Sequence, residues 1–402
     1  MKFRYRALAR AGATALLASG VFATAGAPAS AAGTQTDFEL SVVGTKVGGV
    51  AEGKLGWAKI TNKGTGTPSK LSVTADLSKV DSERIVAMPM TDGDCRAGER
   101  RQFTCEIAAE DIPGPGETLE VPVFVIRGKA GQTSYHAPVT FTINSPDDTN
   151  ESNNSKTIPL MISGWPGVDL GVLVPDVKAK VDSIDDLLSD EEESLPKLRA
   201  GDRTLVAGFV FNWGDQVAAG LQVKVKLPKQ VTFAETEDDC DYSADKRTAT
   251  CTYRDFTLMP ESFSGEGDLG AVFYWPVRVA EDVEGPVTLA GGSWTVNALG
   301  QAPVPQVSRS AAKPLPKNAK MVSAEHVGAD EVDFTDNVDD FAVVVAGAGN
   351  GGGGGGLPVT GVQAGLIGGI GVAVVVAGGV MFLLARRRRV VLVTPGDEKP
   401  ND

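Results

Sequence analysis

Alternating hydrophobic and polar residues recur in short runs along most of the chain. In residues 71–77 and 221–227, leucine, valine or alanine occupies every second position, and polar residues stand between them. Because the side chains of a strand point alternately to its two faces, the apolar residues of each run are expected on one buried face. Valine and threonine recur in further short runs between turns. The pattern predicts many short β-strands and no long helices in the body of the protein.

The predicted strands fall into two repeats with the same order of features. Each has a strand that ends in an Asn-x-Gly turn, an alternating strand, a cysteine pair, a further strand, an Asp- and Asn-rich turn and a closing strand. These features lie at 55–64, 71–77, 95–105, 119–125, 147–154 and 156–160, and again at 205–214, 221–227, 240–251, 271–279, 333–340 and 341–345. About seven strands per repeat predict an antiparallel, immunoglobulin-like β-sandwich. We therefore expect an all-β protein of two tandem sandwiches, 33–163 and 164–346, with Trp57 and Trp213 in their cores.

This order of features resembles the repeat modules of bacterial surface proteins that are called DUF11 or CARDB-like. The resemblance covers both repeats and rests on short motifs: the Asn-x-Gly turns, the cysteine pairs, a Pro-Gly-Glu turn at 115–117 and the Asn-rich closing turns. It implies immunoglobulin-like sandwiches displayed on a cell surface.

The four cysteines lie in two close pairs, Cys95 with Cys105 and Cys240 with Cys251. In an exported chain, an even number of cysteines indicates disulfides. Of the three possible connectivities, pairing within each repeat closes the shortest loops, and such a bridge should stabilise the fold by about 2–3 kcal/mol. It would clip a hairpin or loop, unlike the inter-sheet bridge of antibody domains. A zinc site would need closer spacing and a nearby histidine, so none is predicted.

The N-terminal end has the order of a secretory signal peptide. Residues 1–10 carry four basic side chains, an apolar segment follows from residue 11 to about 26, and small residues close it at Ala32. Cleavage is expected after Ala31 or Ala32, which makes 1–32 a signal peptide. A retained N-terminal span is the alternative, but the apolar segment is short for one.

The C-terminal end combines a pentapeptide, an apolar stretch and a basic cluster. The pentapeptide is Leu357, Pro358, Val359, Thr360 and Gly361, the uncharged stretch is 362–385, and the cluster is Arg386, Arg387, Arg388 and Arg389. A helix of these 24 uncharged residues, at about 1.5 Å each, can cross the roughly 30 Å hydrocarbon core of a membrane. The arginines are expected to stop transfer and to keep the tail, 386–402, in the cytoplasm.

These three parts, in this order, resemble the sorting signal of Gram-positive, and more narrowly actinobacterial, cell-wall proteins. The resemblance implies that the chain pauses in the membrane, and that a sortase then cleaves between Thr360 and Gly361 and joins Thr360 to peptidoglycan. An ordinary single-span anchor is the alternative. The glycine-rich segment 347–356 is expected to be a flexible linker between the second sandwich and the motif.

Charge and residue usage narrow the possible functions. The whole chain carries a net charge of −13; without the four positive charges of the signal peptide and the net two of the segment after Gly361, the mature part carries −19. An acidic exterior argues against binding nucleic acid through a basic face. With only two histidines, His136 and His326, imidazole catalysis and metal binding are restricted.

No catalytic site, cofactor or metal site is predicted. Motifs such as GxSxG, HExxH, a P-loop or a strand-linked GxGxxG are missing from the sequence. The acidic run within 178–199 and the two closing turns are expected to bind calcium weakly at most, because turn formation accounts for their Asp and Asn residues. An internal Lys–Asn isopeptide bond is a further alternative, but the sequence does not identify the two residues that would form it.

The sequence thus predicts a noncatalytic structural or interaction protein that is secreted and joined to the cell wall, with sortase and peptidoglycan as its partners. The alternative is an adhesin that recognises a glycan or a host protein. Trp165, Trp294 and Tyr135 could serve such a surface, although packing within the fold is the simpler role for each. The sequence does not identify a ligand.

Overall fold

The computed structural model describes residues 35–48, 53–90, 95–129, 134–164, 166–188, 195–260, 268–302, 316–324, 333 and 335–347. The predicted signal peptide, sorting motif, apolar stretch and arginine cluster lie outside these residues, as does nearly all of the glycine linker. Within the described part of the chain, no helix has the length and apolar character that a membrane span needs.

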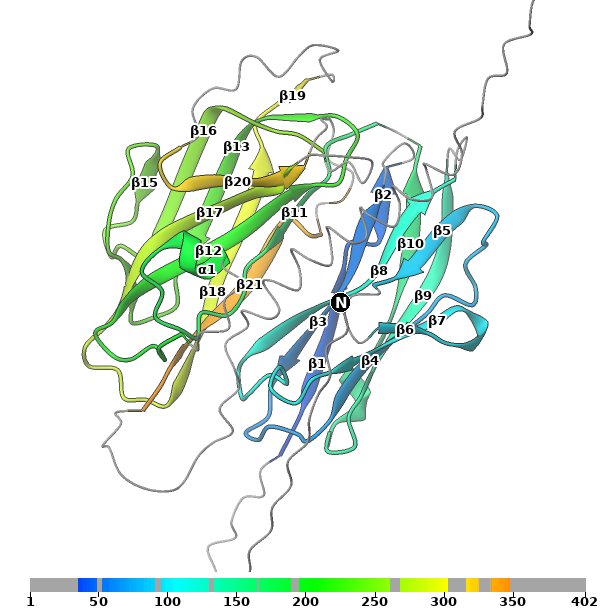
Figure 1. The fold of residues 1–402 in the computed structure, drawn as a ribbon, viewed down its shortest axis with the longest axis horizontal. Helices are drawn as coiled ribbons and strands as arrows, with labels where there is room; N and C mark the ends of the chain where they lie inside the picture. The colour runs from blue at the N-terminus through cyan, green and yellow to red at the C-terminus, as the bar shows by residue number, and fades with distance from the viewer. Residues whose placement is uncertain are drawn as a thin grey trace, which may run out of the picture. The chain divides into compact units, whose positions relative to one another are not determined.

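Two sheets built from residues 38–163 face each other across a shared apolar core (Figure 1, blue to teal). One sheet has the order β1 (Phe38–Val43), β3 (Lys54–Asn62), β8 (Thr118–Gly128) and β5 (Ile85–Pro89). The other has the order β2 (Lys46–Gly48), β10 (Ser155–Ser163), β9 (Tyr135–Asn144), β4 (Leu71–Asp76), β7 (Gln102–Ile107) and β6 (Cys95–Ala97). All these neighbours are antiparallel except β2 and β10, which run parallel. We call this pair of sheets sandwich 1.

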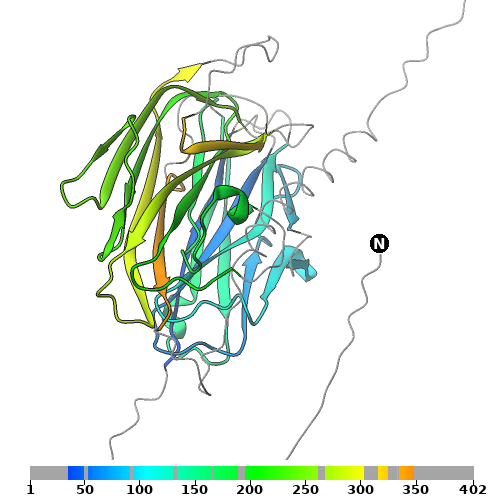
Figure 2. The same ribbon diagram turned by 60° about the vertical axis from the view of Figure 1, so that its left-hand side comes forward.

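Residues 170–345 form a second pair of sheets with its own core (Figures 1 and 2, green to orange). One sheet has the order β11 (Leu170–Leu173), β12 (Arg203–Asn212), β17 (Asp268–Val279) and β14 (Val231–Phe233), and β20 (Ala319–Ala324) also pairs with β17. The other has the order β15 (Cys240–Tyr242), β16 (Thr248–Leu258), β13 (Val217–Lys226), β18 (Val287–Ala298) and β21 (Val338–Val345), and β19 (Gln301–Ala302) also pairs with β13. We call this pair sandwich 2.

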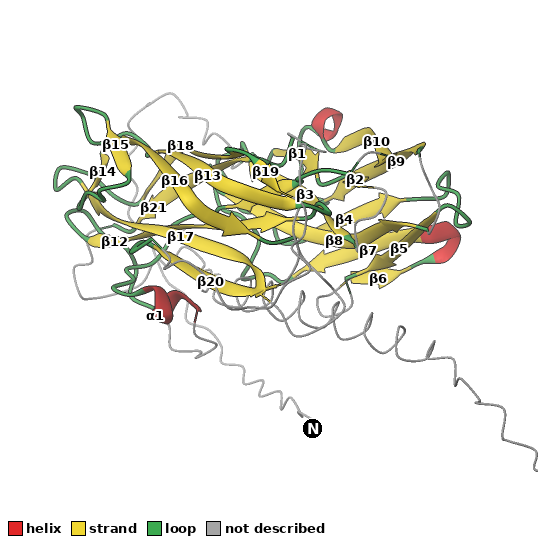
Figure 3. Cartoon of the chain, turned by 90° about the horizontal axis from the view of Figure 1, so that it is seen from above, coloured by secondary structure: helices red, strands yellow, loops and turns green. Residues whose placement is uncertain are grey.

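The all-β, tandem-sandwich prediction is confirmed, and the two sandwiches share one topology. In each, the strand that ends in Asn-x-Gly lies between an edge strand and the long strand that follows the cysteine pair: β1-β3-β8 matches β11-β12-β17. The other sheets match as β10-β9-β4-β7-β6 and β21-β18-β13-β16-β15. Among the described residues, helix is confined to short pieces (Figure 3), of which α1 (Ile184–Leu188) lies in the acidic run within 178–199. The domain limits 33–163 and 164–346 agree with these sheets but stay a prediction.

The Asn-x-Gly turns show why the repeats fold alike. Asn62 is fully buried; its amide donates to the carbonyls of Gly66 and Pro113, and its carbonyl accepts from the Gly64 amide. Asn212 makes the corresponding bonds to Gln216, Leu258 and Gly214. A Cβ on Gly64 would lie 2.3 Å from a backbone carbonyl oxygen, and one on Gly214 would lie 2.1 Å from another. Only glycine fits such an approach.

Both predicted disulfides are present and clip neighbouring strands. Cys95 on β6 lies directly opposite Cys105 on β7, and Cys240 on β15 lies opposite Cys251 on β16. Each bridge ties a short edge strand to the sheet, as the hairpin interpretation predicted.

Candidate functional site: a buried ionic interface

Charged side chains from both sandwiches are buried where sandwich 1 meets sandwich 2. Sandwich 1 contributes three lysines from β2 and β3 and two glutamates at the start of β8, while sandwich 2 contributes residues that flank β11 and that precede or lie within β21. We call this set the ionic interface; it comprises Lys46, Lys54, Lys59, Glu117, Glu120, Asp169, Asp176, Lys178, Asp333, Asp336 and Asp339. Four lysines thus face seven carboxyl groups.

Lys54 is the centre of one group. Its side chain is completely buried, and its Nζ lies 2.6 Å from Oδ1 of Asp169, 3.0 Å from Oδ2 of Asp336 and 3.6 Å from Oδ2 of Asp333. The other oxygen of Asp333 is 2.9 Å from Nζ of Lys46, which is one-third exposed. Three carboxylates from sandwich 2 therefore surround a single ammonium of sandwich 1.

The pKa values of this group follow from burial and from the central ammonium. Burial raises the pKa of Asp336 to about 6, against the opposing charge of Lys54. The pKa of Asp169 is raised well above its usual value, also by burial. Burial by itself would lower the pKa of Lys54, but the charges of Asp169, Asp336 and Asp333 outweigh it and raise the pKa. Lys54 is therefore held as an ammonium.

Lys59 is the centre of the second group. Its Nζ donates a hydrogen bond to Oδ1 of Asp339, and the Val174 amide donates to Oδ2 of the same carboxyl at 2.6 Å. Glu120 lies directly opposite Lys59 in the β3–β8 pairing, is buried, and has no hydrogen-bond partner at Oε2. Burial raises the pKa of both Glu120 and Asp339, and their mutual repulsion raises that of Glu120 further.

Asp176 and Lys178 tie the start of β8 to sandwich 2. The Thr118 amide donates to Oδ2 of Asp176 at 2.8 Å, and the Ala342 amide donates to its Oδ1 at 2.7 Å. Lys178 donates to Oε2 of Glu117 at 2.5 Å. Burial, partly offset by the charge of Lys178, raises the pKa of Asp176 to about 7. One carboxyl thus joins backbone from both sandwiches.

An apolar cluster adjoins the ionic interface and also draws on both sandwiches. Leu55, Trp57 and Val125 of sandwich 1 belong to the same buried cluster as Phe211 and Trp213 of sandwich 2. The sandwiches are therefore joined by apolar packing as well as by charge, as expected for parts of a single compact unit.

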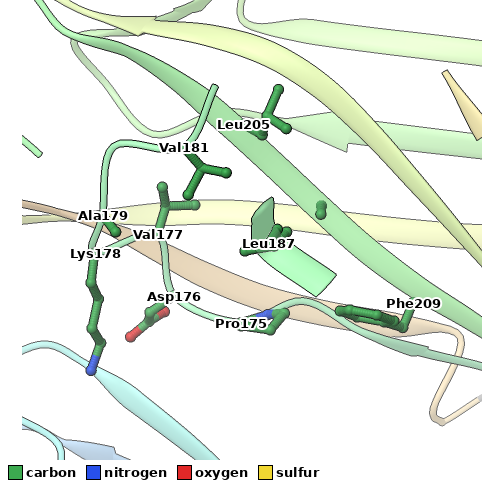
Figure 4. Close-up of a pocket in the computed structure, with 10 residues that line it drawn as sticks. Pro175, Asp176, Val177, Lys178, Ala179, Val181, Leu187, Leu205 and Phe209 are labelled. Carbon is green, nitrogen blue, oxygen red and sulfur yellow. The ribbon is translucent and has the colours of Figure 1, made fainter. Parts of the chain in front are cut away.

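A small pocket lies beside this contact (Figure 4). Its lining is mostly apolar, including Val181, Leu187, Leu205 and Phe209, and its volume is about 40 Å³. This volume is enough for a few waters, each of which needs at least about 10–15 Å³. Among the described residues, no group of three or more His, Cys, Asp or Glu is placed to hold a metal ion.

The structure places the sequence-predicted aromatic residues mainly inside the fold. Trp57, Trp213 and Trp294 are buried. Burial of the first two is confirmed, but they lie in the apolar cluster that joins the sandwiches and not in the core of either one. Trp294 packs edge-on against Trp275. Tyr135 is half-buried, and its hydroxyl accepts the Asp81 amide. His136 is exposed on β9. Trp165 and His326 lie outside the described residues.

Sequence reasoning missed the ionic interface. The closing turn 333–340 was explained by turn formation, whereas its carboxylates bind Lys46, Lys54 and Lys59. One signal was available: Lys59 follows Leu55 and Trp57 at a period of two, which places a lysine on a strand face that is otherwise apolar.

Comparison with known proteins gives similarities to solved structures only. No family model matches the chain, and no curated protein matches it. Among solved structures, the chain is similar to the CARDB domain of a Pyrococcus furiosus protein (15% identity, 32% of this chain, 96% of that chain, TM-score 0.19). It is also similar to the Enterococcus faecalis MSCRAMM ACE (10%, 79%, 97%, 0.20) and to the C-terminal domain of the Streptococcus pyogenes antigen I/II-family protein AspA (9%, 73%, 99%, 0.20). At these scores, the similarity carries no argument about the fold or the function of this chain.

Proposed function

We propose that this protein is a noncatalytic structural protein of a Gram-positive cell surface, joined to peptidoglycan through Thr360 and presenting its two sandwiches as one rigid body. The observation that carries the proposal is the ionic interface. Its charged groups form ion pairs and hydrogen bonds that hold one sandwich to the other.

Carboxyl groups with strongly raised pKa values are a common mark of active sites. Here the carboxyls of Asp169, Asp336 and Asp339 face lysines of the other sandwich, and Asp176 accepts backbone amides from both sides. The pocket beside them is small and lined mostly by apolar side chains. A structural use therefore explains the perturbed groups without a reaction on a bound molecule.

Attachment to the wall is supported by the sequence at both ends. A signal peptide, the pentapeptide 357–361, an uncharged stretch and four arginines occur in the order that export and sorting require. The two disulfides agree with an oxidising environment outside the cytoplasm. The proposed role of the wall linkage is to fix the rigid pair of sandwiches at the surface.

The test of anchoring is wall fractionation followed by mass spectrometry of the C-terminal peptide. We expect a peptide that ends at Thr360 and carries a fragment of the peptidoglycan cross-bridge. Thr360→Ala should release the protein to the medium or leave it in the membrane, while Val359→Ala, at the variable position of the motif, should stay attached. Covalent attachment of the Thr360→Ala protein, or a mature chain that still contains 362–402, would refute anchoring.

The test of the noncatalytic role is independent of the anchor. Glycan arrays and pull-downs with a soluble 33–346 fragment should show no specific ligand. Saturable binding that is lost on changing an exposed residue would instead support an adhesin.

A further inference from the structure

The ionic interface contains more carboxyls than ammonium groups. Its seven Asp and Glu side chains face four lysines, which leaves three carboxyls in excess. All seven acidic residues are buried, whereas only Lys54 of the four lysines is. A buried negative charge without a counterion is costly, because the protein interior solvates it poorly. If every carboxyl were ionised, the junction between the sandwiches would carry an uncompensated charge.

Glu120 is one of the carboxyls in excess. Its charge interacts with those of Lys59 on β3, Asp339 on β21 and Asp176, which follows β11. Lys59 already donates to Asp339, and no donor among the described residues reaches Oε2 of Glu120. An ionised Glu120 would therefore face two carboxylates of sandwich 2 across the junction, with one shared ammonium between them.

Asp176 is a second carboxyl in excess. Its Oδ2 accepts the Thr118 amide across the junction, while Lys178, the nearest ammonium among the described residues that acts on it, donates to Glu117 instead. Opening of the junction would break the bond to Thr118 and expose this carboxyl to water. Each sandwich thus contributes a buried carboxyl that is better solvated when the junction is open.

We propose that the junction between the sandwiches is a pH-sensitive hinge, closed while Glu120 and Asp176 hold protons and opening more often once they ionise. Each sandwich has its own apolar core, so the junction can open while both stay folded. The lysine pairs and the shared apolar cluster oppose opening at every pH. The proposal rests on the rigid pair of the proposed function and adds the condition under which it is rigid. Its failure would leave the anchoring test unaffected.

The direction follows from proton binding. Burial raises the pKa of Asp176 to about 7 in the closed junction, and burial together with the charge of Asp339 raises that of Glu120. A carboxyl whose pKa is higher in the closed state favours closure at low pH, and this preference is lost as the pH rises through the closed value. Between pH 5 and pH 7, Asp176 alone should lower the ratio of closed to open molecules by up to about 100-fold, or tenfold per pH unit.

Hydrogen exchange of the full chain at pH 5 and pH 8, read residue by residue with mass spectrometry, tests the hinge. Two amides of sandwich 1 donate to carboxyls of sandwich 2: Thr118 to Asp176 at 2.8 Å and Lys46 to Asp333 at 3.4 Å. Once divided by the intrinsic exchange rate at each pH, their exchange measures how often the junction opens. We expect this corrected exchange to rise by about 10- to 100-fold from pH 5 to pH 8.

Amides inside each sandwich report whether the sandwiches stay folded. The Asn62 amide donates to a carbonyl of sandwich 1, and the Leu227 amide donates to a carbonyl of sandwich 2. Their corrected exchange should change little between the two pH values. An equal rise at all four amides would mean that the whole fold loosens, and it would overturn the hinge. Equal corrected exchange of Thr118 and Lys46 at pH 5 and pH 8 would overturn it as well.

Glu120→Gln tests the carboxyl on the side of sandwich 1. Glutamine has the shape of a protonated glutamate and stays uncharged at every pH, so the rise at Thr118 and Lys46 should shrink by at least about tenfold. Glu106→Gln is the matched control, since Glu106 is exposed on β7, and it should behave as the wild type does. A folded Glu120→Gln protein with the full wild-type rise would refute the part of Glu120 in the hinge.

Discussion

Replacing Lys54 by methionine tests whether the ionic interface holds the molecule together. The substitution removes the single ammonium that three buried carboxyls share, at 2.6, 3.0 and 3.6 Å, and keeps most of the side-chain volume. Removing one partner of a buried ion pair costs about 3–5 kcal/mol, because the remaining charges lose their compensation. We expect Lys54→Met to lower the free energy of unfolding by that amount near pH 8.

The loss should shrink as the pH falls. With Lys54 present, the pKa of Asp336 is already about 6, and without the ammonium it must rise further. A carboxyl whose pKa is higher in the folded state than in the unfolded state stabilises the fold at low pH, and this stability is lost as the pH rises through the folded value. At pH 5 the carboxyls that have lost Lys54 therefore take up protons, and the protein regains part of the lost stability.

Urea unfolding, followed by tryptophan fluorescence at pH 5 and pH 8, measures both effects. Lys63→Met is the matched control, since Lys63 also lies next to β3 but forms a half-exposed pair with Glu39, worth about 0–1 kcal/mol. If Lys54→Met cost no more than Lys63→Met, or cost the same at both pH values, the interface would not be a stabilising ion cluster.

Three further predictions concern the same fold. Gly64→Ala should cost about 1–3 kcal/mol through its clash with a backbone carbonyl, whereas Gly98→Ala, whose Cβ would have no neighbour nearer than 3.6 Å, should be close to neutral in the same urea assay. Replacing Cys240 and Cys251 together by serine should cost about 2–4 kcal/mol, seen as a lower urea midpoint, and an unchanged midpoint would argue against a stabilising bridge. The wild-type urea midpoint should fall between pH 5 and pH 8, because the pKa of Asp176 rises from 3.8 to about 7 on folding, and a rising midpoint would contradict this burial effect.

The fold was predictable because its determinants are local in the sequence. Alternation of period two marks β4 and β13, and the Asn-x-Gly turns mark the ends of β3 and β12. Because the same features occur in both repeats, the prediction of each sandwich supports the prediction of the other. The short strands β19 and β20 escaped prediction, since two to six residues without clear alternation give no reliable signal.

The ionic interface was not predictable in the same way, because its pairs are distant along the chain. Lys54 and Asp169 are 115 residues apart, and Lys59 and Asp339 are 280 apart. An aspartate in a turn looks the same in sequence whether it faces water or a lysine of another sandwich. Only the packing of sandwich 2 on sandwich 1 distinguishes the two cases.

The two repeats use the same sheet face differently. Counting back from Asn62 and Asn212, Lys59 corresponds to Phe209, and in the strand pairing Glu120 corresponds to Val272. The charged pair of sandwich 1 is thus an apolar pair in sandwich 2. Phe209 lines the small pocket, and residues from the segment 175–181 and Leu187 of α1 line it as well (Figure 4). In sandwich 1 this face is therefore covered by sandwich 2. In sandwich 2 the equivalent face is covered by residues 175–181 and α1. A third sandwich that docked in the same way would meet α1.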